Sequence, residues 1–231
     1  MSGTGPLSPL PVVDAEAEAV GAATFVLSLR ARGIREVGVL RAMELVPREV
    51  FAPRRFADLA RSDVALPLPC GQTMTAPGTV AGMLVALGVE SGQRVLEIGT
   101  GSGYVSALLA RLGAEVVTVE RYAALGESAA QHWRVAGVEG IVGHVADGLA
   151  GHERPGPQAR FDRILLNGAV PSIPDAVIGQ LAPSGRLVGA LSGEGRPRLV
   201  RLDRDADGAV RQETGAGVRI SPLVPGVSQF L

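Results

Sequence analysis

The chain has 231 residues, 46% of them hydrophobic and only 3% aromatic, so it can bury a large core built from aliphatic side chains. Twenty-two basic residues balance 23 acidic ones to a net charge of -1, and this balance, with no basic stripe, argues against nucleic-acid and anionic-membrane partners. All the basic residues are arginine, and the absence of lysine excludes Schiff-base catalysis and the lysine-dependent phosphate loop.

The cysteine count and the start of the chain indicate a compartment. The single cysteine, Cys70, excludes an intrachain disulfide, and three histidines without ligand spacing predict no metal site. The first long apolar run, residues 19–29, follows Asp14, Glu16 and Glu18 instead of the basic segment that a signal peptide has. The run is also too short to cross a bilayer. We therefore expect a cytoplasmic monomer without a membrane partner.

The first third of the chain predicts helices and a long loop. Residues 1–13 are rich in proline and glycine and are typical of a flexible leader. A helix ending near Gly33 follows, and a second helix covers residues 35–45. Residues 50–77 contain four prolines and predict an ordered loop with one short strand, a kind of loop that is usually functional. We assign residues 14–78 to N-terminal helices and a substrate loop.

From residue 79 onward the pattern alternates between helix and strand. Strands are expected at 94–98, 115–119, 138–145, 161–166 and 185–191, and helices at 79–87, 102–112, 123–136 and 174–181. This alternation predicts an α/β, doubly wound fold with a parallel sheet covered on both faces. The Asp207-Gly208 turn lies between two stretches of alternating polarity and predicts a terminal antiparallel hairpin. Residues 79–231 would form the cofactor-binding core of one structural domain.

A glycine-rich turn between a buried strand and a helix is the strongest local signal. Residues 95–103 read VLEIGTGSG, with G-x-G-x-G spacing, and Tyr104 stands where a dinucleotide motif requires glycine. The carboxylate of Glu97 would repel a pyrophosphate, yet it suits the ammonium and sulfonium groups of S-adenosylmethionine. We predict cofactor contacts from Glu97, Gly99, Thr100, Gly101, Ser102 and Gly103.

Two acids at later strand ends extend this prediction. Glu120 lies 21 residues beyond Gly99, close to the spacing of about 20 at which an acid reaches ribose hydroxyls. Asp147, followed by Gly148, comes after the third strand and could accept from the adenine amino group. Alone, the glycine loop and the Asp147-Gly148 pair are each compatible with an ordinary turn. Three markers in order, each after a strand, predict binding of S-adenosylmethionine.

Several further stretches resemble the protein-L-isoaspartate O-methyltransferase family, over roughly residues 22–226. They are VPREVF at 46–51, LP at 66–67, GQTMTAP at 71–77, AVP at 169–171, SGRLV at 184–188 and PL at 222–223. The resemblance implies a mostly parallel, seven-stranded, Rossmann-like sheet of the class I methyltransferase type. It also implies methylation of the α-carboxyl of L-isoaspartyl residues in peptides or proteins, the first step of their repair.

The same resemblance assigns roles on the substrate side. The Thr75 hydroxyl would hold the substrate carboxylate as the catalytic group, and no general base is needed because carboxylates are ionised at neutral pH. Asn167 could orient the substrate backbone, or could be a turn residue before Gly168. The expected substrate-binding residues are Gln72, Thr73, Met74, Ala76, Asn167 and Ser221.

The sequence departs from the family pattern on the substrate side. Thr75 replaces the usual serine, Arg61 replaces an aromatic residue, and Val224 replaces a hydroxyl residue. These departures leave two alternatives. One is a biosynthetic methyltransferase that esterifies an Asp of a dedicated peptide and gives an aspartimide. The other is a non-catalytic protein that binds S-adenosylmethionine, against which the retained Gln72 and Thr73 argue.

Overall fold

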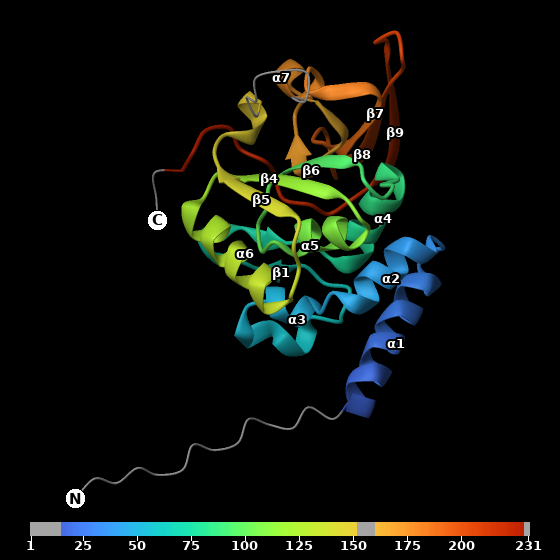
Figure 1. The fold of residues 1–231 in the computed structure, drawn as a ribbon, viewed down its shortest axis with the longest axis vertical. Helices are drawn as coiled ribbons and strands as arrows, with labels where there is room; N and C mark the ends of the chain where they lie inside the picture. Colours follow the sequence, from blue (N-terminus) through green and yellow to red (C-terminus); the bar gives the residue numbers. More distant parts are fainter. Residues whose placement is uncertain (1–14, 152–159, 229–231) are drawn as a thin grey trace, which may run out of the picture.

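The computed structural model describes residues 15–151 and 160–228, and the expected leader at 1–13 lies outside the described residues. The chain begins with α1 (Ala15–Ala31) and α2 (Val37–Leu45), followed by the single-turn helix α3 (Arg48–Phe51). Helix α1 packs on α2, and α2 packs in turn on the helices that cover the sheet (Figure 1). Among the described residues, no helix is long and apolar enough to cross a membrane.

The long predicted loop folds into a small hairpin. Two 3-10 turns, η1 (Arg54–Leu59) and η2 (Pro69–Gly71), alternate with strands β1 (Leu66–Pro67) and β2 (Thr73–Met74). The two strands are antiparallel and place Leu66 opposite Met74, both of them buried. The sequence predicted one short strand here, and the structure has two, which pair with each other and place Leu66 and Met74 in the core.

The main sheet has seven strands in the order β5-β4-β3-β6-β7-β8-β9. The first five in chain order run parallel to one another, and β8 and β9 form the predicted antiparallel hairpin at the edge. The strands are β3 (Arg94–Ile98), β4 (Glu115–Glu120), β5 (Ile141–Val145), β6 (Phe161–Val170), β7 (Leu181–Leu191), β8 (Arg198–Arg204) and β9 (Val210–Gly217).

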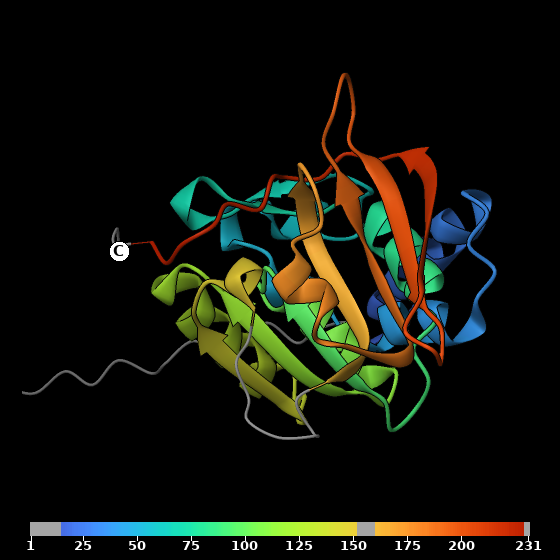
Figure 2. The same cartoon turned by 90° about the horizontal axis from the view of Figure 1, so that it is seen from above.

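Both faces of the sheet carry aliphatic side chains, as a doubly wound fold requires. Val95 and Val116 belong to the core under one layer of helices, whereas Leu96 and Ile98 belong to a second core that includes Val177. Figures 1 and 2 show these layers. The helices are α4 (Pro77–Leu87), α5 (Tyr104–Arg111), α6 (Ala123–Val135) and α7 (Asp175–Ile178).

Among the boundaries that differ from the predicted ones, those around β6 and β7 bear on the site. The helix expected at 174–181 is only α7, because Leu181 already pairs with Phe161 as the first residue of β7. Strand β6 continues past residue 166 to Val170, where Ala169 pairs with β7 and bridges the C-terminal segment. Asn167 therefore lies inside β6, at a register shift, and does not end the strand.

After β9 the chain returns across the sheet. Ser221 accepts a backbone hydrogen bond from Ala169 at 2.8 Å, and Leu223 donates one back to the Ala169 carbonyl at 2.8 Å. Ser228 then donates to the Arg121 carbonyl at 3.0 Å. The C-terminal segment, residues 221–228, thus crosses from β6 to the end of β4 (Figure 2).

Candidate active site

A cavity opens at the carboxyl ends of the central strands, with about 860 Å³ of empty space that includes its opening to solvent. Strand β3 lies between β4 on one side and β6 on the other, so the strand order reverses beside it. Such a switch point is where open α/β sheets bind ligands. The walls include residues 72–75 of the substrate segment, 99–102 of the glycine loop, 119–122 at the end of β4, 146–149 after β5, Asn167 of β6, and 221–224 of the C-terminal segment.

Most of the predicted site residues line this cavity. On the cofactor side they are Gly99, Thr100, Gly101, Ser102, Glu120, Asp147 and Gly148, and on the substrate side Gln72, Thr73, Met74, Thr75, Asn167 and Ser221. Three predicted residues, Glu97, Gly103 and Ala76, are not among its lining residues. Six parts of the chain that are separate in sequence thus meet around one cavity.

Two side chains of α6 hold the glycine loop through its backbone carbonyls. Gly99, Gly101 and Gly103 all have positive φ (97°, 55° and 84°), the left-handed region that favours glycine. His132 Nδ1 lies 2.9 Å from the Ser102 carbonyl, and Trp133 Nε1 donates to the Gly103 carbonyl at 2.9 Å. Sequence reasoning does not find this support, because nothing in the local sequence of His132 and Trp133 marks a partner 30 residues earlier.

Glu97 is not among the residues that line the cavity, and its predicted contact with the cofactor stays a prediction. The period of two along β3 places Glu97 on the same face as Val95, under α5, where it is completely buried. The hydroxyls of Ser106 and Thr118 donate to its Oε2, the latter at 2.9 Å. Burial raises the pKa of Glu97 to about 7, although these hydrogen bonds favour the ionised form. Glu97 is a buried support of the loop.

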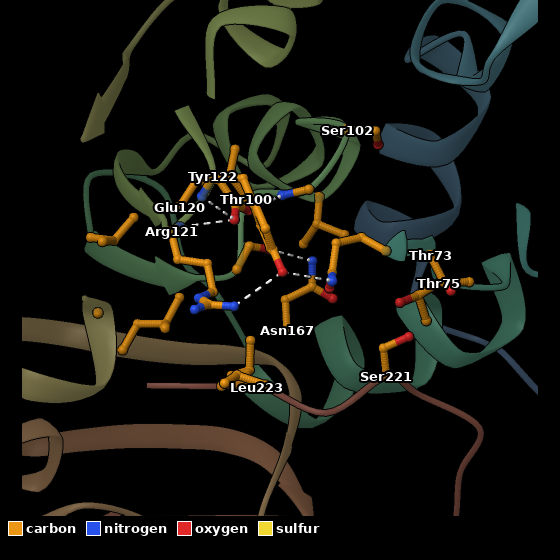
Figure 3. A pocket seen from close by; sticks show the side chains of 18 of the residues that line it. Thr73, Thr75, Thr100, Ser102, Glu120, Arg121, Tyr122, Asn167, Ser221 and Leu223 are labelled. Atoms are coloured by element: carbon orange, nitrogen blue, oxygen red, sulfur yellow. Dashed lines mark hydrogen bonds between the residues drawn. The ribbon is translucent and has the colours of Figure 1, made fainter. Parts of the chain in front are cut away.

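Glu120 stands beside the glycine loop with its carboxylate fixed by backbone amides. Its Oε2 accepts from Gly101 N at 2.8 Å, and its Oε1 accepts from Arg121 N at 2.8 Å and Tyr122 N at 3.1 Å. A carboxylate has about four acceptor sites, so it can still accept from a ligand hydroxyl. The carboxylate is therefore oriented before any ligand binds, and Figure 3 shows it at the cavity wall.

Asp147 anchors the C-terminal segment. Its Oδ1 accepts from Leu149 N at 3.0 Å, and its Oδ2 accepts from Gly226 N at 2.7 Å. The next residue, Gly148, has no room for a side chain, because a Cβ there would lie 2.6 Å from Ile98 Cγ2. The carboxylate predicted to meet the adenine amino group thus also holds two backbone amides.

Arg121 and Tyr122, which the sequence analysis did not select, bridge three walls of the cavity. Arg121 donates through Nη1 to the Tyr122 hydroxyl at 3.0 Å and through Nε to the Gly226 carbonyl at 2.9 Å. Gln72 Nε2 lies 3.5 Å from the same Tyr122 hydroxyl (Figure 3). The bridge links the substrate segment, the end of β4 and the C-terminal segment.

On the substrate side, Thr75 and Ser221 lie across the cavity from Glu120 and Arg121 (Figure 3). Asn167 lies between these groups, but its amide is already engaged: Nδ2 donates to Glu97 Oε1 at 3.1 Å and to the Gly99 carbonyl at 3.0 Å. Its Oδ1 is buried without a hydrogen-bond partner among the described residues. Asn167 Nδ2 thus holds the glycine loop, and the predicted contact with the substrate backbone, for which Oδ1 is the remaining acceptor, stays a prediction.

Comparison with known families explains this arrangement. The family model for protein-L-isoaspartate(D-aspartate) O-methyltransferase matches residues 22–228. The chain belongs to this family. The protein-L-isoaspartate O-methyltransferase of Xanthobacter autotrophicus is 45% identical over 219 residues, which cover 94% of this chain and 98% of the relative. That of Azorhizobium caulinodans is 44% identical over 224 residues, covering 95% and 100%.

Solved structures agree on the fold. A protein-L-isoaspartate O-methyltransferase of Plasmodium falciparum, in complex with S-adenosyl-L-homocysteine, superimposes with a TM-score of 0.75 at 18% identity, over 87% of this chain and 97% of the other. A second structure of a protein-L-isoaspartate O-methyltransferase gives a TM-score of 0.76 at 22% identity, over 89% and 67%.

The predicted family, fold class, enzyme class and cofactor are confirmed. The chain is an S-adenosylmethionine-dependent methyltransferase. Within residues 15–151 and 160–228, no three His, Cys, Asp or Glu side chains gather as a metal site would require.

Proposed function

We propose that this enzyme methylates the α-carboxyl of L-isoaspartyl residues in peptides or proteins, as the repair-type members of its family do. One observation carries the proposal. The segment at 72–75, QTMT, forms one wall of the cavity whose opposite wall is the glycine loop with Glu120. A carboxylate held at Thr75 would therefore face the cofactor within one enclosed space.

The residues present fit S-adenosylmethionine. The positive φ values of the glycine loop leave its backbone open to a ligand, and the nearest atom to a Cβ at Gly101 would be Leu68 Cδ1 at 3.6 Å. Glu120 would accept from the ribose hydroxyls, and the wall at residues 146–149 would cover the adenine. Bound S-adenosylmethionine supplies an electrophilic methyl group on a sulfonium.

The reaction needs little proton chemistry. An oxygen of the substrate carboxylate forms a bond to the methyl carbon as the carbon–sulfur bond breaks, and the electron pair of that bond stays on sulfur. Because the carboxylate is already ionised, no base removes a proton. Thr75 would donate a hydrogen bond that aligns the attacking oxygen, and the apolar walls at Leu223 and Val119 would limit water.

Labelled methyl transfer to paired peptides tests this proposal. One peptide carries Asp and the other isoaspartate at the same position. We expect label only in the isoaspartyl peptide, released as methanol in mild base because its methyl ester collapses to a succinimide. A base-stable amine or ether linkage would contradict carboxyl methylation. Inert isoaspartyl peptides, together with activity on one native peptide, would instead establish the dedicated biosynthetic role.

We also infer that the enzyme works as a cytoplasmic monomer whose N-terminal part, residues 14–78, supplies the substrate wall and whose core, residues 79–231, supplies the cofactor wall. The single cysteine suits a reducing compartment. Size-exclusion chromatography with light scattering should give one chain mass, with activity per chain independent of concentration.

A further inference from the structure

Arg48 is a buried arginine that forms no ion pair with a carboxylate in the described part of the chain, although Asp63 and Glu49 are near enough to interact with its charge. Only 1% of the residue is exposed, and its guanidinium donates to three backbone carbonyls. Nη1 donates to Ala60 O at 2.7 Å, and Nη2 donates to Val64 O and Thr75 O, each at 3.2 Å. The three carbonyls come from successive parts of the segment that ends in the substrate wall.

The neighbouring acidic residues form ion pairs with other arginines. Asp63 forms an ion pair with Arg32 at 2.8 Å, and Glu49 pairs with Arg61. Burial lowers the pKa of Arg48, and its Nε is buried without a hydrogen-bond partner among the described residues. Burying a charge without a close counter-ion is costly, and an apolar side chain of this size would fill the space at lower cost. The three hydrogen bonds to backbone carbonyls are therefore what Arg48 provides and an apolar side chain does not.

The helix that carries Arg48 also reaches the cofactor side. Phe51, at the other end of α3, packs at a tilt against Tyr104 and edge-on against His132, with ring centroids 5.5 Å and 5.7 Å apart. Tyr104 begins the helix after the glycine loop, and His132 contacts the Ser102 carbonyl. The Arg48 guanidinium itself lies 5.9 Å from the centroid of the Tyr104 ring. One turn of helix therefore touches both walls of the cavity.

We propose that Arg48 is a positioning residue for methyl transfer, which fixes the Thr75 peptide and so sets the Thr75 hydroxyl and its neighbouring amides against the cofactor loop. The assignment rests on the proposed function of Thr75. A guanidinium suits the task because its planar fork presents donors in several fixed directions. A lysine ammonium at this place is a single point on a flexible stem and cannot reach three carbonyls in this geometry.

The test compares Arg48→Lys and Arg48→Met with a matched control, Arg163→Met. Arg163 is also partly buried and donates to backbone carbonyls, to Gly88 O at 3.1 Å and Asp162 O at 2.9 Å, but it is not among the residues that line the cavity. Three quantities are measured: kcat/KM for an isoaspartyl peptide, the Kd of S-adenosylhomocysteine by calorimetry, and amide hydrogen exchange.

For both Arg48 variants we expect kcat/KM to fall by about tenfold to a hundredfold, since misplacing a reacting group by about 1 Å has effects of this size. The Kd of S-adenosylhomocysteine should stay within about twofold, because the cofactor contacts are made by other residues. Amide hydrogen exchange should become faster at residues 60–76 and stay unchanged at residues 98–104. Arg163→Met should leave all three quantities at the site unchanged.

Two results would overturn the assignment: unchanged kcat/KM in Arg48→Lys, or a loss of cofactor affinity in parallel with activity, which would indicate a general structural role. If Arg48→Met does not fold, Arg48→Lys and its exchange pattern still decide between these outcomes. If the wild-type enzyme leaves isoaspartyl peptides unmodified, the proposed substrate fails, whereas faster exchange confined to residues 60–76 would still support the role of Arg48 in ordering the segment.

Discussion

Thr75 is the residue on which the substrate side depends most directly. Thr75→Val keeps the size and β-branching of the side chain and removes one hydroxyl donor. If that donor aligns the carboxylate, methyl transfer should slow by about tenfold to a thousandfold. The measurement is kcat with an isoaspartyl peptide, and calorimetry should show that S-adenosylhomocysteine still binds.

Thr75→Ser is the matched control, because it restores the hydroxyl and removes only the methyl group. It should retain activity and can raise it toward peptides that the extra methyl group hinders. Full activity in Thr75→Val would show that backbone amides alone align the carboxylate.

On the cofactor side, the corresponding test is a substitution of Glu120. Glu120→Ala removes the acceptor that faces the cavity and leaves the Gly101 amide without its partner at 2.8 Å. Affinity for S-adenosylhomocysteine should weaken by roughly 1–3 kcal/mol, the range for hydrogen bonds to a charged group. Glu120→Gln, which keeps one acceptor, should lose less. Calorimetry on folded variants measures both, and equal affinity for wild type and Glu120→Ala would remove Glu120 from the cofactor site.

At the scale of elements, the C-terminal segment closes one wall of the cavity. Gly226 is its anchor: its φ is +82°, its amide donates to Asp147, and its carbonyl accepts from Arg121. Gly226→Ala meets no atom within 4 Å of the new Cβ, so its cost is the left-handed backbone, about 1–2 kcal/mol. We expect this cost to loosen the segment and to weaken S-adenosylhomocysteine binding by up to about tenfold.

Gly195→Ala is the control for backbone strain. Gly195 has a φ of +84° and lies in the turn between β7 and β8, and a Cβ added there would also meet no atom within 4 Å. The substitution should carry a similar local cost and leave the Kd unchanged. Equal effects of the two substitutions on the Kd would mean that docking of the C-terminal segment is not part of cofactor binding.

For the whole molecule, Glu97 links stability to pH. Its folded pKa, raised to about 7 by burial, lies above the ordinary value of a glutamate. The stability gained from this proton is present at low pH and is lost as the pH rises through about 7. Relative to Glu97→Gln, the wild-type protein should therefore lose stability, by an amount on the order of 3 kcal/mol, between about pH 5 and pH 8.

Urea unfolding of both proteins across this pH range gives the difference directly. Glu115→Gln, an exposed substitution on β4, is the control and should keep the pH dependence of the wild-type protein. A constant difference between Glu97→Gln and wild type would contradict a neutral, buried Glu97 at low pH.

The sequence alone determined the fold class, the cofactor and most of the cavity walls. The reason is that these features follow from local patterns: apolar strands with a period of two, a glycine turn that needs positive φ, and acids at strand ends that parallel pairing brings to one edge. Glu120 and residues 99–102 of the glycine loop lie where that reasoning places them, and Thr75 lies where the family resemblance places it.

Only the tertiary structure decided which polar groups face the ligand and which support the site. Glu97 lies at a strand end like Glu120, yet the pleat turns it under α5 and out of the cavity. Arg48 contacts a carbonyl 27 residues away, and Arg121 contacts one 105 residues away. Such contacts depend on how separate elements pack, and no local pattern records them, because a side chain's partner is chosen by the space around it and not by its neighbours in the chain.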